Sequence, residues 1–350
     1  MSGWSDQTRA EYDGAYFKIF GSPAAAPLDS KNVFVAWRDG SKDSIRISYS
    51  VYIIDTNKWG KSKLAGFKDG TGNEVPFNTK QSPCVACIDT GKVFLAWNGS
   101  GNDGIWYSFY NFANDVWANQ KNIKVNGKAP DISGALAAVY VPPKDGEGRP
   151  IKGVGDNGAV IIAYIGNNNQ YPGIKYVIGT LNSERDGIDV WSEPAMAQDV
   201  DGTIFGTVQA AGITLALTTV DGQVAVAMAW DGSGNNGIWF SQYVINSNAW
   251  TPQYNIKAVN SSSKKYPYGP GLVAYDSVAD GESLMLAWAY RDDGQANFFK
   301  DVPPLVASAR AQGWTLGGTN YALTAPDGST VFAFWNGVAD NGFWYASYSS

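Results

Sequence analysis

The chain of 350 residues contains no histidine. Without an imidazole, it has no histidine-based catalytic triad, no histidine general base and no histidine-ligated metal site. Lysine and arginine number 26 against 32 acidic residues, which gives a formal charge of −6, and the basic residues form no cluster. A nucleic-acid or anionic-membrane partner is therefore not expected. No apolar run is long enough for a membrane helix and no signal peptide is visible, so we expect a cytoplasmic protein or one released by a non-classical route.

Cysteine is also rare, with only Cys84 and Cys87 in the segment PCVACID. Their odd spacing places them on opposite faces of a strand, so they cannot easily bond to each other. We therefore expect two buried free thiols.

Glycine and aromatic residues are abundant instead, with 40 Gly, 14 Trp and 19 Tyr. This composition favours short strands and tight turns over helices. The segment from Val93 to Trp117 consists of VFLAW, NGSGNDG, IWYSFYNF and ANDVW, and close copies begin at Val226 and Val331. Such self-similarity indicates one structural unit that is used several times.

Two marker positions extend this repeat over the whole chain. A second marker follows each first marker by roughly twenty to twenty-seven residues, as expected for a hairpin and one further strand. The last unit lacks a second marker before Ser350, but Trp4 has the matching sequence context. We therefore expect the N-terminal segment to supply the last strand of the sixth unit and to close a ring. The first marker is Trp37, Trp97, Tyr164, Trp230, Trp288 and Trp335, and the second is Trp59, Trp117, Trp191, Trp250 and Trp314.

Turn signals divide each unit into strands. Asp-Gly pairs such as Asp221-Gly222 and Asp327-Gly328 lie between apolar runs, which is a hairpin pattern. Four strands in each of six units predict an all-β fold, a single six-bladed β-propeller domain over residues 1–350, with four antiparallel strands per blade and the N-terminal segment completing the last blade. The third unit carries an insertion, Pro142–Asn157, which we expect to be a surface excursion.

The loop between the second and third strands is the most repeated feature of units two, four and six. In these units a glycine-rich loop with Asn and Asp links the first-marker Trp to a Trp in the third strand. Unit one has Arg46 in place of the third-strand Trp, unit three has Lys175 and unit five has Asn297. The three full copies fall on alternate units and suggest three equivalent sites.

These residue types suit a sugar. A sugar needs a flat aromatic face for its C–H side and short amide or carboxylate groups for its hydroxyls. Trp106, Trp239 and Trp344 are the stacking candidates. The complete candidate set is Trp97, Asn98, Asp103, Trp106, Trp230, Asp231, Asn236, Trp239, Trp335, Asn336, Asn341 and Trp344.

The same loops have two other interpretations. Asn-Gly and Asp-Gly are ordinary hairpin turns, and a strand Trp between blades is ordinary core. Calcium is a second candidate ligand, through Asp103, Asp231 or Asp340, but each loop offers one acid and lacks the alternating acidic pattern of a dedicated site. We expect no metal and no other cofactor.

Catalysis is not expected, although it stays an alternative. A propeller glycosidase needs paired carboxylates, for which Asp39, Asp292 and Asp293 are the only suggestion. A repeated loop also argues against one catalytic centre. A protein-interaction scaffold is the other alternative, because it would use the same rigid disc.

The loop WNGSGNDGIWYS and the trailing Trp resemble the repeats of β-propeller lectins from fungi and bacteria. Six-bladed members such as the fucose-binding fungal lectins are most similar, and the mushroom N-acetylglucosamine-binding and tectonin-like groups are looser matches. The resemblance implies multivalent binding of glycans or glycoproteins at small pockets, without catalysis. The fucose lectins place an Arg, a Glu and a Trp in each site, and this chain has no repeated Arg and little Glu. That departure argues against fucose and leaves N-acetylated and galactose-type sugars open.

Overall fold

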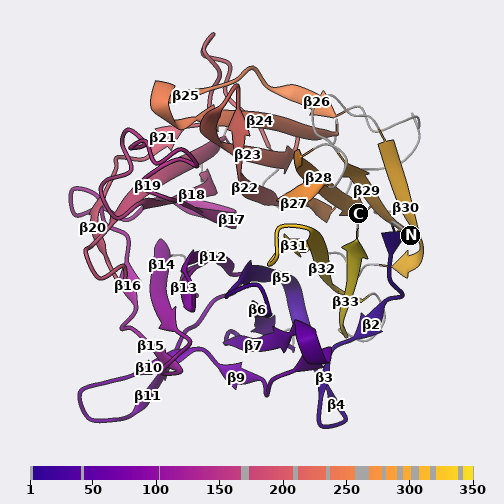
Figure 1. Ribbon diagram of the computed structural model, residues 1–350. Coiled ribbons are helices and arrows are strands. Elements are labelled where there is room, and N and C mark those ends of the chain that lie inside the picture. The colour runs from indigo at the N-terminus through magenta and orange to yellow at the C-terminus, as the bar shows by residue number, and fades with distance from the viewer. Residues whose placement is uncertain are drawn as a thin grey trace.

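Antiparallel sheets stand side by side around one axis and make up the described part of the chain (Figure 1). The structure is a computed structural model. It describes residues 3–40, 43–101, 103–166, 173–207, 212–233, 237–256, 268–277, 281–289, 295–300, 307–315, 321–337 and 342–349. Within these residues no helix is long and apolar enough to cross a membrane. Short 3-10 turns, Ile54–Thr56 and Ile245–Ser247, lie at the outer edges of two sheets.

Five blades follow one plan, in which three strands lead outward from the axis and two short strands form the outer edge. Both edge strands pair with the third strand, so the edge is one strand broken in two. The blades are β5 (Ile19–Pro27), β6 (Asn32–Asp39), β7 (Ile47–Ile53), β8 (Lys58–Trp59) and β9 (Lys63–Leu64); β12 (Cys84–Asp89), β13 (Lys92–Asn98), β14 (Ile105–Asn111), β15 (Val116–Trp117) and β16 (Lys121–Asn122); β17 (Ile132–Val141), β18 (Ala159–Gly166), β19 (Ile174–Leu181), β20 (Ile188–Trp191) and β21 (Ala195–Met196); β22 (Ile213–Val220), β23 (Gln223–Asp231), β24 (Ile238–Val244), β25 (Ala249–Trp250) and β26 (Tyr254–Ile256); and β31 (Ala322–Thr324), β32 (Thr330–Asn336), β33 (Phe343–Ser349), β1 (Gly3–Trp4) and β2 (Thr8–Arg9).

In three of the five blades, a buried serine in the third strand bonds to the chain where the edge is broken. The hydroxyl of Ser108 donates a hydrogen bond to the carbonyl of Ala118, the residue after the second-marker Trp117, at 2.6 Å. The N–H of Ala118 donates to the carbonyl of Phe109 at 2.8 Å. These bonds fix the chain at the break, because a buried carbonyl needs a partner where the regular ladder stops. The same serine-to-carbonyl bond joins Ser50 to Gly60 at 2.7 Å and Ser241 to Thr251 at 2.8 Å.

The prediction of a six-bladed propeller with four strands in every blade is wrong. The structure has five blades of the common plan, each of five strands, and not six. Between β22–β26 and the last blade lies a different sheet of four strands, β27 (Tyr268–Ser277), β28 (Gly281–Ala289), β29 (Gln295–Lys300) and β30 (Ala307–Thr315). Its outer strand is continuous and begins with Ala307 opposite Lys300. Trp314 lies past a register shift near Gln295, so it does not occupy the second-marker position that the sequence assigned to it.

The N-terminal segment does join the last blade. Gly3 and Trp4 pair with Ser349 and Tyr348, and Thr8 pairs with Tyr345, so β33 lies between β32 and the start of the chain. The indole of Trp4 contacts the ring of Tyr348 at 5.4 Å between centroids. This closure leaves β33 without a free edge over the paired residues, which explains why a second-marker Trp stands at the start of the sequence.

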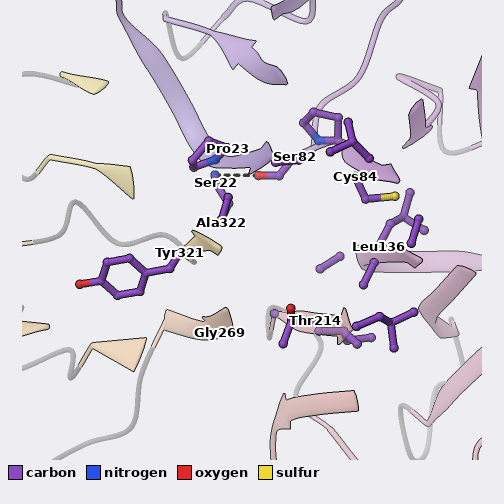
Figure 2. A pocket seen from close by; sticks show the side chains of 18 of the residues that line it. Ser22, Pro23, Ser82, Cys84, Leu136, Thr214, Gly269, Tyr321 and Ala322 are labelled. Carbon is purple, nitrogen blue, oxygen red and sulfur yellow. Dashed lines mark hydrogen bonds between the residues drawn. The ribbon is translucent and has the colours of Figure 1, made fainter. Parts of the chain in front are cut away.

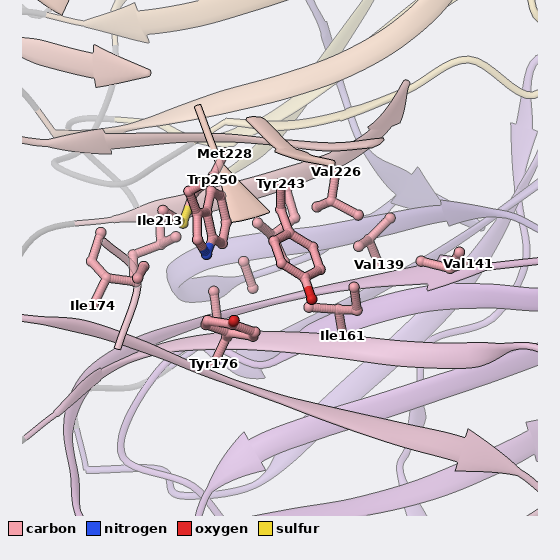
Figure 3. Packing of buried hydrophobic residues seen from close by; sticks show 14 of the residues in the cluster. Val139, Val141, Ile161, Ile174, Tyr176, Ile213, Val226, Met228, Tyr243 and Trp250 are labelled. Atoms are coloured by element: carbon pink, nitrogen blue, oxygen red, sulfur yellow. The ribbon is translucent and has the colours of Figure 1, made fainter. Parts of the chain in front are cut away.

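Aromatic rings fill the contacts between neighbouring blades. All first-marker tryptophans are buried, and three of them stack on a phenylalanine from the preceding link. Four second-marker tryptophans contact a tyrosine from the third strand of the preceding blade. Figure 3 shows one such contact, where Trp250 and Tyr243 face Tyr176. The stacked pairs are Phe17–Trp37, Phe77–Trp97 and Phe205–Trp230, and the edge contacts are Trp59–Tyr345, Trp117–Tyr49, Trp191–Tyr107 and Trp250–Tyr176.

A turn residue in the left-handed conformation ties the outer edges together. Asp115, with φ 53°, accepts hydrogen bonds from Tyr110 of its own blade at 2.8 Å and from Tyr49 of the preceding blade at 3.1 Å. Lys63 of the preceding blade contacts the other carboxylate oxygen. Burial, and then the charge of Asp115, raise the pKa of Tyr49 to about 12. Asn57 has the same role for Tyr52 and Tyr345.

The insertion Pro142–Asn157 is more than the surface excursion expected from the sequence. Its residues Ile151 and Val154 are buried in the core cluster between the third and fourth blades. The N–H of Lys152 donates to Asn246 of the neighbouring blade at 3.0 Å. The insertion therefore covers one blade contact.

Candidate functional site

The second blade shows how the repeated loop places its two tryptophans. Trp97 on β13 and Trp106 on β14 are direct cross-strand partners, so both side chains lie on the same face of the sheet. Trp97 is 1% exposed and stacks on Phe77 at 4.7 Å, whereas Trp106 is half-buried at the edge of the same cluster. The inner indole is therefore core, and the outer indole is available to a ligand.

Gly99 forms the floor under the outer indole. A Cβ atom at this position would lie 2.7 Å from Nε1 and 2.8 Å from Cδ1 of Trp106. Carbon atoms normally approach to about 3.5–4.0 Å, so only glycine fits below the ring. The φ of Gly99 lies outside the left-handed region, so contact rather than backbone conformation requires the glycine. The Gly of the Asn-Gly pair thus has a packing role beyond its turn role.

Asp103 holds the indole from the side. Nε1 of Trp106 donates to Oδ1 of Asp103 at 3.0 Å, and the Asp103 side chain is exposed. The second oxygen, Oδ2, has no hydrogen-bond partner within the part of the chain that the structure describes. The amide of Asn122 donates to the backbone carbonyl of Asp103 at 3.1 Å and fixes the loop. An aromatic face and an acceptor oxygen are thereby held next to each other.

The other loops keep part of this arrangement. Trp230 and Trp239 are paired in the fourth blade, and Trp335 and Trp344 in the last, with the first member of each pair buried and the second half-buried. In the last blade Gly337 again forms the floor, because its Cβ would lie 2.5 Å from Nε1 of Trp344. Five residues named from the sequence lie outside the described residues: Asn236, Asn341, the calcium candidate Asp340 and the candidate acids Asp292 and Asp293.

The residues after the inner tryptophans are buried rather than displayed. Asn98, Asp231 and Asn336 are 1%, 0% and 3% exposed. The link strand crosses them: Thr79 pairs with Gly99, and the hydroxyl of Thr207 donates to the carbonyl of Asp231 at 2.8 Å. The structure therefore places Asn98, Asp231 and Asn336 under the loop, with little surface for a hydroxyl partner.

The residue opposite each outer tryptophan on the edge strand was not predicted from the sequence. It is Asn122 for Trp106, Asn255 for Trp239 and Arg9 for Trp344. The signal was present, since each of these residues stands five positions after a second-marker Trp. The last blade has an arginine where the second and fourth blades have an asparagine, and the guanidinium of Arg9 lies 6.0 Å from the Trp344 ring centroid. The three loops are therefore not equivalent.

Unit one differs in register from the sequence interpretation. Trp37 pairs with Ser48, so Ser48 and not Arg46 takes the place of the third-strand Trp. Arg38, equivalent to Asn98, is 8% exposed and donates to the carbonyls of Ser44 and Lys80 at 2.7 and 2.8 Å. Beside it a pocket of about 350 Å³ opens between Trp37, Asp39 and the β3–β4 hairpin (Glu11–Tyr12 and Ala15–Tyr16).

A second cavity, of about 530 Å³, lies on the axis (Figure 2). The innermost strands line it with small side chains, and the N–H of Ser22 donates to Ser82 Oγ across one blade contact at 2.8 Å. None of the described residues that line it is acidic or basic.

Cys84 lines the wall of this cavity, and burial raises the pKa of its thiol to about 12. Cys84 and Cys87 are both free, as expected, but Cys87 is only partly buried.

Metal ligands do not gather at the loops that can be examined. Among the described residues no three Asp, Glu or Cys side chains lie close enough to hold an ion. Asp103 and Asp231 belong to different blades, and each is the only acid of its loop.

Comparison with known proteins shows the fold. No protein-family model matches the chain, and no curated protein matches it significantly. A mutant of AofleA from Arthrobotrys oligospora has a TM-score of 0.62 at 11% identity, over 96% of this chain and 84% of that chain. A mutant of the Aleuria aurantia lectin in complex with α-methyl-L-fucoside has 0.57 at 10%, over 95% and 97%. The α-L-arabinofuranosidase Arb93A from Fusarium graminearum has 0.61 at 10%, over 99% and 97%. The chain is thus a β-propeller, a fold that lectins and glycosidases share.

Proposed function

We propose that the protein is a multivalent carbohydrate-binding protein that performs no catalysis. It uses the loops between the second and third strands of the second, fourth and last blades, which we call the rim loops. The observation that carries the proposal is the outer indole of the second blade, half-buried over Gly99 and held at Nε1 by Asp103. The C–H face of a sugar ring stacks on such an indole, and an adjacent carboxylate oxygen accepts its hydroxyl. Trp239 and Trp344 occupy the same position in two further blades.

The comparisons support a role with carbohydrates. One similar structure is described as a lectin in complex with α-methyl-L-fucoside, and another as an α-L-arabinofuranosidase in complex with an iminosugar inhibitor. At identities of 10–11%, the ligands of these structures do not define the sugar that this chain binds. The loops favour a ligand with one apolar face and vicinal hydroxyls, which galactose-type and N-acetylated sugars both present.

The distribution of carboxylates among the described residues supports binding without catalysis. Hydrolysis of a glycosidic bond requires two carboxyl groups about 5–10 Å apart around one sugar. The axial cavity, of about 530 Å³, has no carboxylate among the described residues of its lining. The loop of the second blade has one acid, Asp103, which already holds an indole. These sites suit recognition, with each loop contributing a weak affinity of about 0.1–1 mM that multivalency increases.

A glycan array with three chains tests the proposal. The wild type is expected to bind a defined set of neutral glycans, and the variant with Trp106→Ala, Trp239→Ala and Trp344→Ala is expected to lose that binding while keeping its circular dichroism spectrum. Phe112→Ala is the matched control, because Phe112 is an aromatic residue 37% exposed near the other end of β14. Unchanged binding by the folded triple variant would reject these loops. Release of reducing ends from a bound polysaccharide would replace the lectin function by catalysis, and an array without signal would favour a protein-interaction scaffold.

A further inference from the structure

The pocket beside the first blade lies on a face where two positions differ from those of the second blade. In the second blade, Gly99 lies under the indole of Trp106. In the first blade the equivalent positions hold Asp39 and Ser48, since Ser48 pairs with Trp37 as Trp106 pairs with Trp97. Removal of the indole frees space, and a side chain can then stand where only glycine fits elsewhere. The pocket of about 350 Å³ lies on this face, with Trp37 at its base and Asp39 in its wall.

Cations dominate the polar lining of this pocket. Lys18 comes from the link strand and Lys61 from the outer edge, and both are exposed. Neither forms a salt bridge within the part of the chain that the structure describes. Asp39 is the one acid among the described residues of the lining, and its Oδ1 accepts the N–H of Gly40 at 2.9 Å. Two lysines against one aspartate give a positive lining on a chain whose net charge is −6.

Lys18 is fixed in place by its backbone. It pairs with Gly342 of the last blade, and a Cβ on Gly40 would lie 2.3 Å from the Cβ of Lys18. The link strand is therefore held tightly against the Asp39–Gly40 turn. The backbone of Lys18 is therefore already ordered, so binding of a ligand costs only the conformational entropy of the lysine side chain.

An aromatic ring faces the same space. Tyr16 lines the pocket, is 52% exposed and has the guanidinium of Arg9 over one face of its ring at 4.1 Å. The cation orients the ring and leaves the opposite face for another partner. Tyr12, 43% exposed, extends this aromatic surface along the hairpin.

We propose that this pocket is a separate binding site for acidic saccharides, that is, sugars that carry a carboxylate or a sulfate. The anionic group pairs with Lys18 and Lys61, the sugar ring lies on Tyr16, and Asp39 and Ser62 bond to hydroxyl groups. A volume of about 350 Å³ suits one sugar residue. The inference rests on the proposed carbohydrate-binding function but uses none of the rim tryptophans.

Calorimetric or NMR titrations with matched ligands test it. Methyl β-D-glucuronide and galactose 6-sulfate are compared with the neutral methyl β-D-glucoside and galactose, which separates carboxylate from sulfate recognition. The wild type is expected to bind at least one acidic ligand about tenfold more tightly than its neutral parent, and 0.5 M NaCl is expected to weaken that binding several-fold. Lys18→Gln with Lys61→Gln is expected to abolish the preference for the acidic ligand. Lys121→Gln with Lys128→Gln removes the same charge from exposed positions elsewhere and is expected to have no effect.

A second variant fills the pocket instead of changing its charge. Asp39→Gly with Ser48→Trp rebuilds the arrangement of the second blade and is expected to remove acidic-ligand binding while both lysines stay. Equal binding of acidic and neutral ligands by the wild type, or retained preference in the double lysine variant, would overturn the inference. Failure of the proposed function is distinguishable, because the wild type would then bind no saccharide of either kind. Retained acidic binding in the triple tryptophan variant supports a separate site, and its loss places acidic sugars at the rim loops instead.

Discussion

The contact between Gly99 and Trp106 predicts a specific energetic coupling. In Gly99→Ala the new Cβ would lie 2.7 Å from Nε1 of Trp106 and 1.8 Å from Oδ1 of Asp103. The aspartate can rotate away, but the indole must move by about 1 Å to restore a normal carbon contact. Overpacking of this kind costs about 1–3 kcal/mol. We therefore expect Gly99→Ala to destabilise the protein by about that amount and to weaken sugar binding at this loop.

A double-mutant cycle isolates the contact. In a Trp106→Ser background the ring is absent, as it is at Ser48 of the first blade, so Gly99→Ala is expected to cost nothing or to stabilise by about 0.4–1 kcal/mol through the unfolded chain. The coupling energy between the two positions is then about 1–3 kcal/mol. The measurement is the urea midpoint for the wild type, both single variants and the double variant.

A neighbouring glycine gives the control. The Cβ of Gly101→Ala would meet only Asp103 Cγ, at 3.9 Å, so this change is expected to shift stability by less than about 0.5 kcal/mol. If Gly99→Ala has the same cost with and without the indole, the glycine serves the turn alone, and the argument that it supports a binding ring is refuted.

Two further predictions concern the frame. Hydrogen bonds from Lys63, Tyr110 and Tyr49 lower the pKa of Asp115, although its partial burial opposes the shift. The ionised carboxylate therefore stabilises the folded state fully above the ordinary aspartate pKa of about 4. This contribution is lost as the pH falls through the lower pKa that Asp115 has in the folded protein. Asp115→Asn keeps an acceptor for both tyrosines, and its stability deficit in urea unfolding is expected at pH 7 and to vanish near pH 2; a deficit that stays constant with pH would contradict this. Burial raises the pKa of Cys84 to about 12, and we expect a thiol reagent at pH 8 to label Cys84 only after denaturation, a result that fast labelling of the native protein would contradict.

Periodicity in the sequence predicted the radial sheets and the closure by the N-terminal segment. Both depend on local strand patterns and on Trp spacing, which are visible along the chain. The break in the outer strand was not visible, because it depends on hydrogen bonds across the sheet, such as the one from the buried Ser108 to the carbonyl of Ala118. For that reason the second edge strand of each blade was missed. Trp314 was assigned by spacing alone, and the register shift in β30 shows that spacing was insufficient.

The candidate site was predicted in part. The sequence identified Trp97 and Trp106 together, but it could not tell that the first is covered by Phe77 from a distant link. It likewise could not show that Asn98 lies beneath the loop, because burial of a polar side chain depends on tertiary contacts. Asn122 was overlooked although it stands in a regular position, since its relation to the indole appears only once the edge strand is placed.

The contacts between blades and the rim loops therefore depend on different residues. Trp97 with Phe77, and Asp115 with its tyrosines, hold neighbouring blades together from below and outside the loop. The outer indole contributes only to the edge of the core, so it can be lost where the residue beneath it changes as well. The first blade has Asp39 and Ser48 at these two positions, and there a pocket lies on the same face while Trp37 stacks on Phe17. A ring of blades built in this way can change its ligand at one rim position without loosening the contacts that close it.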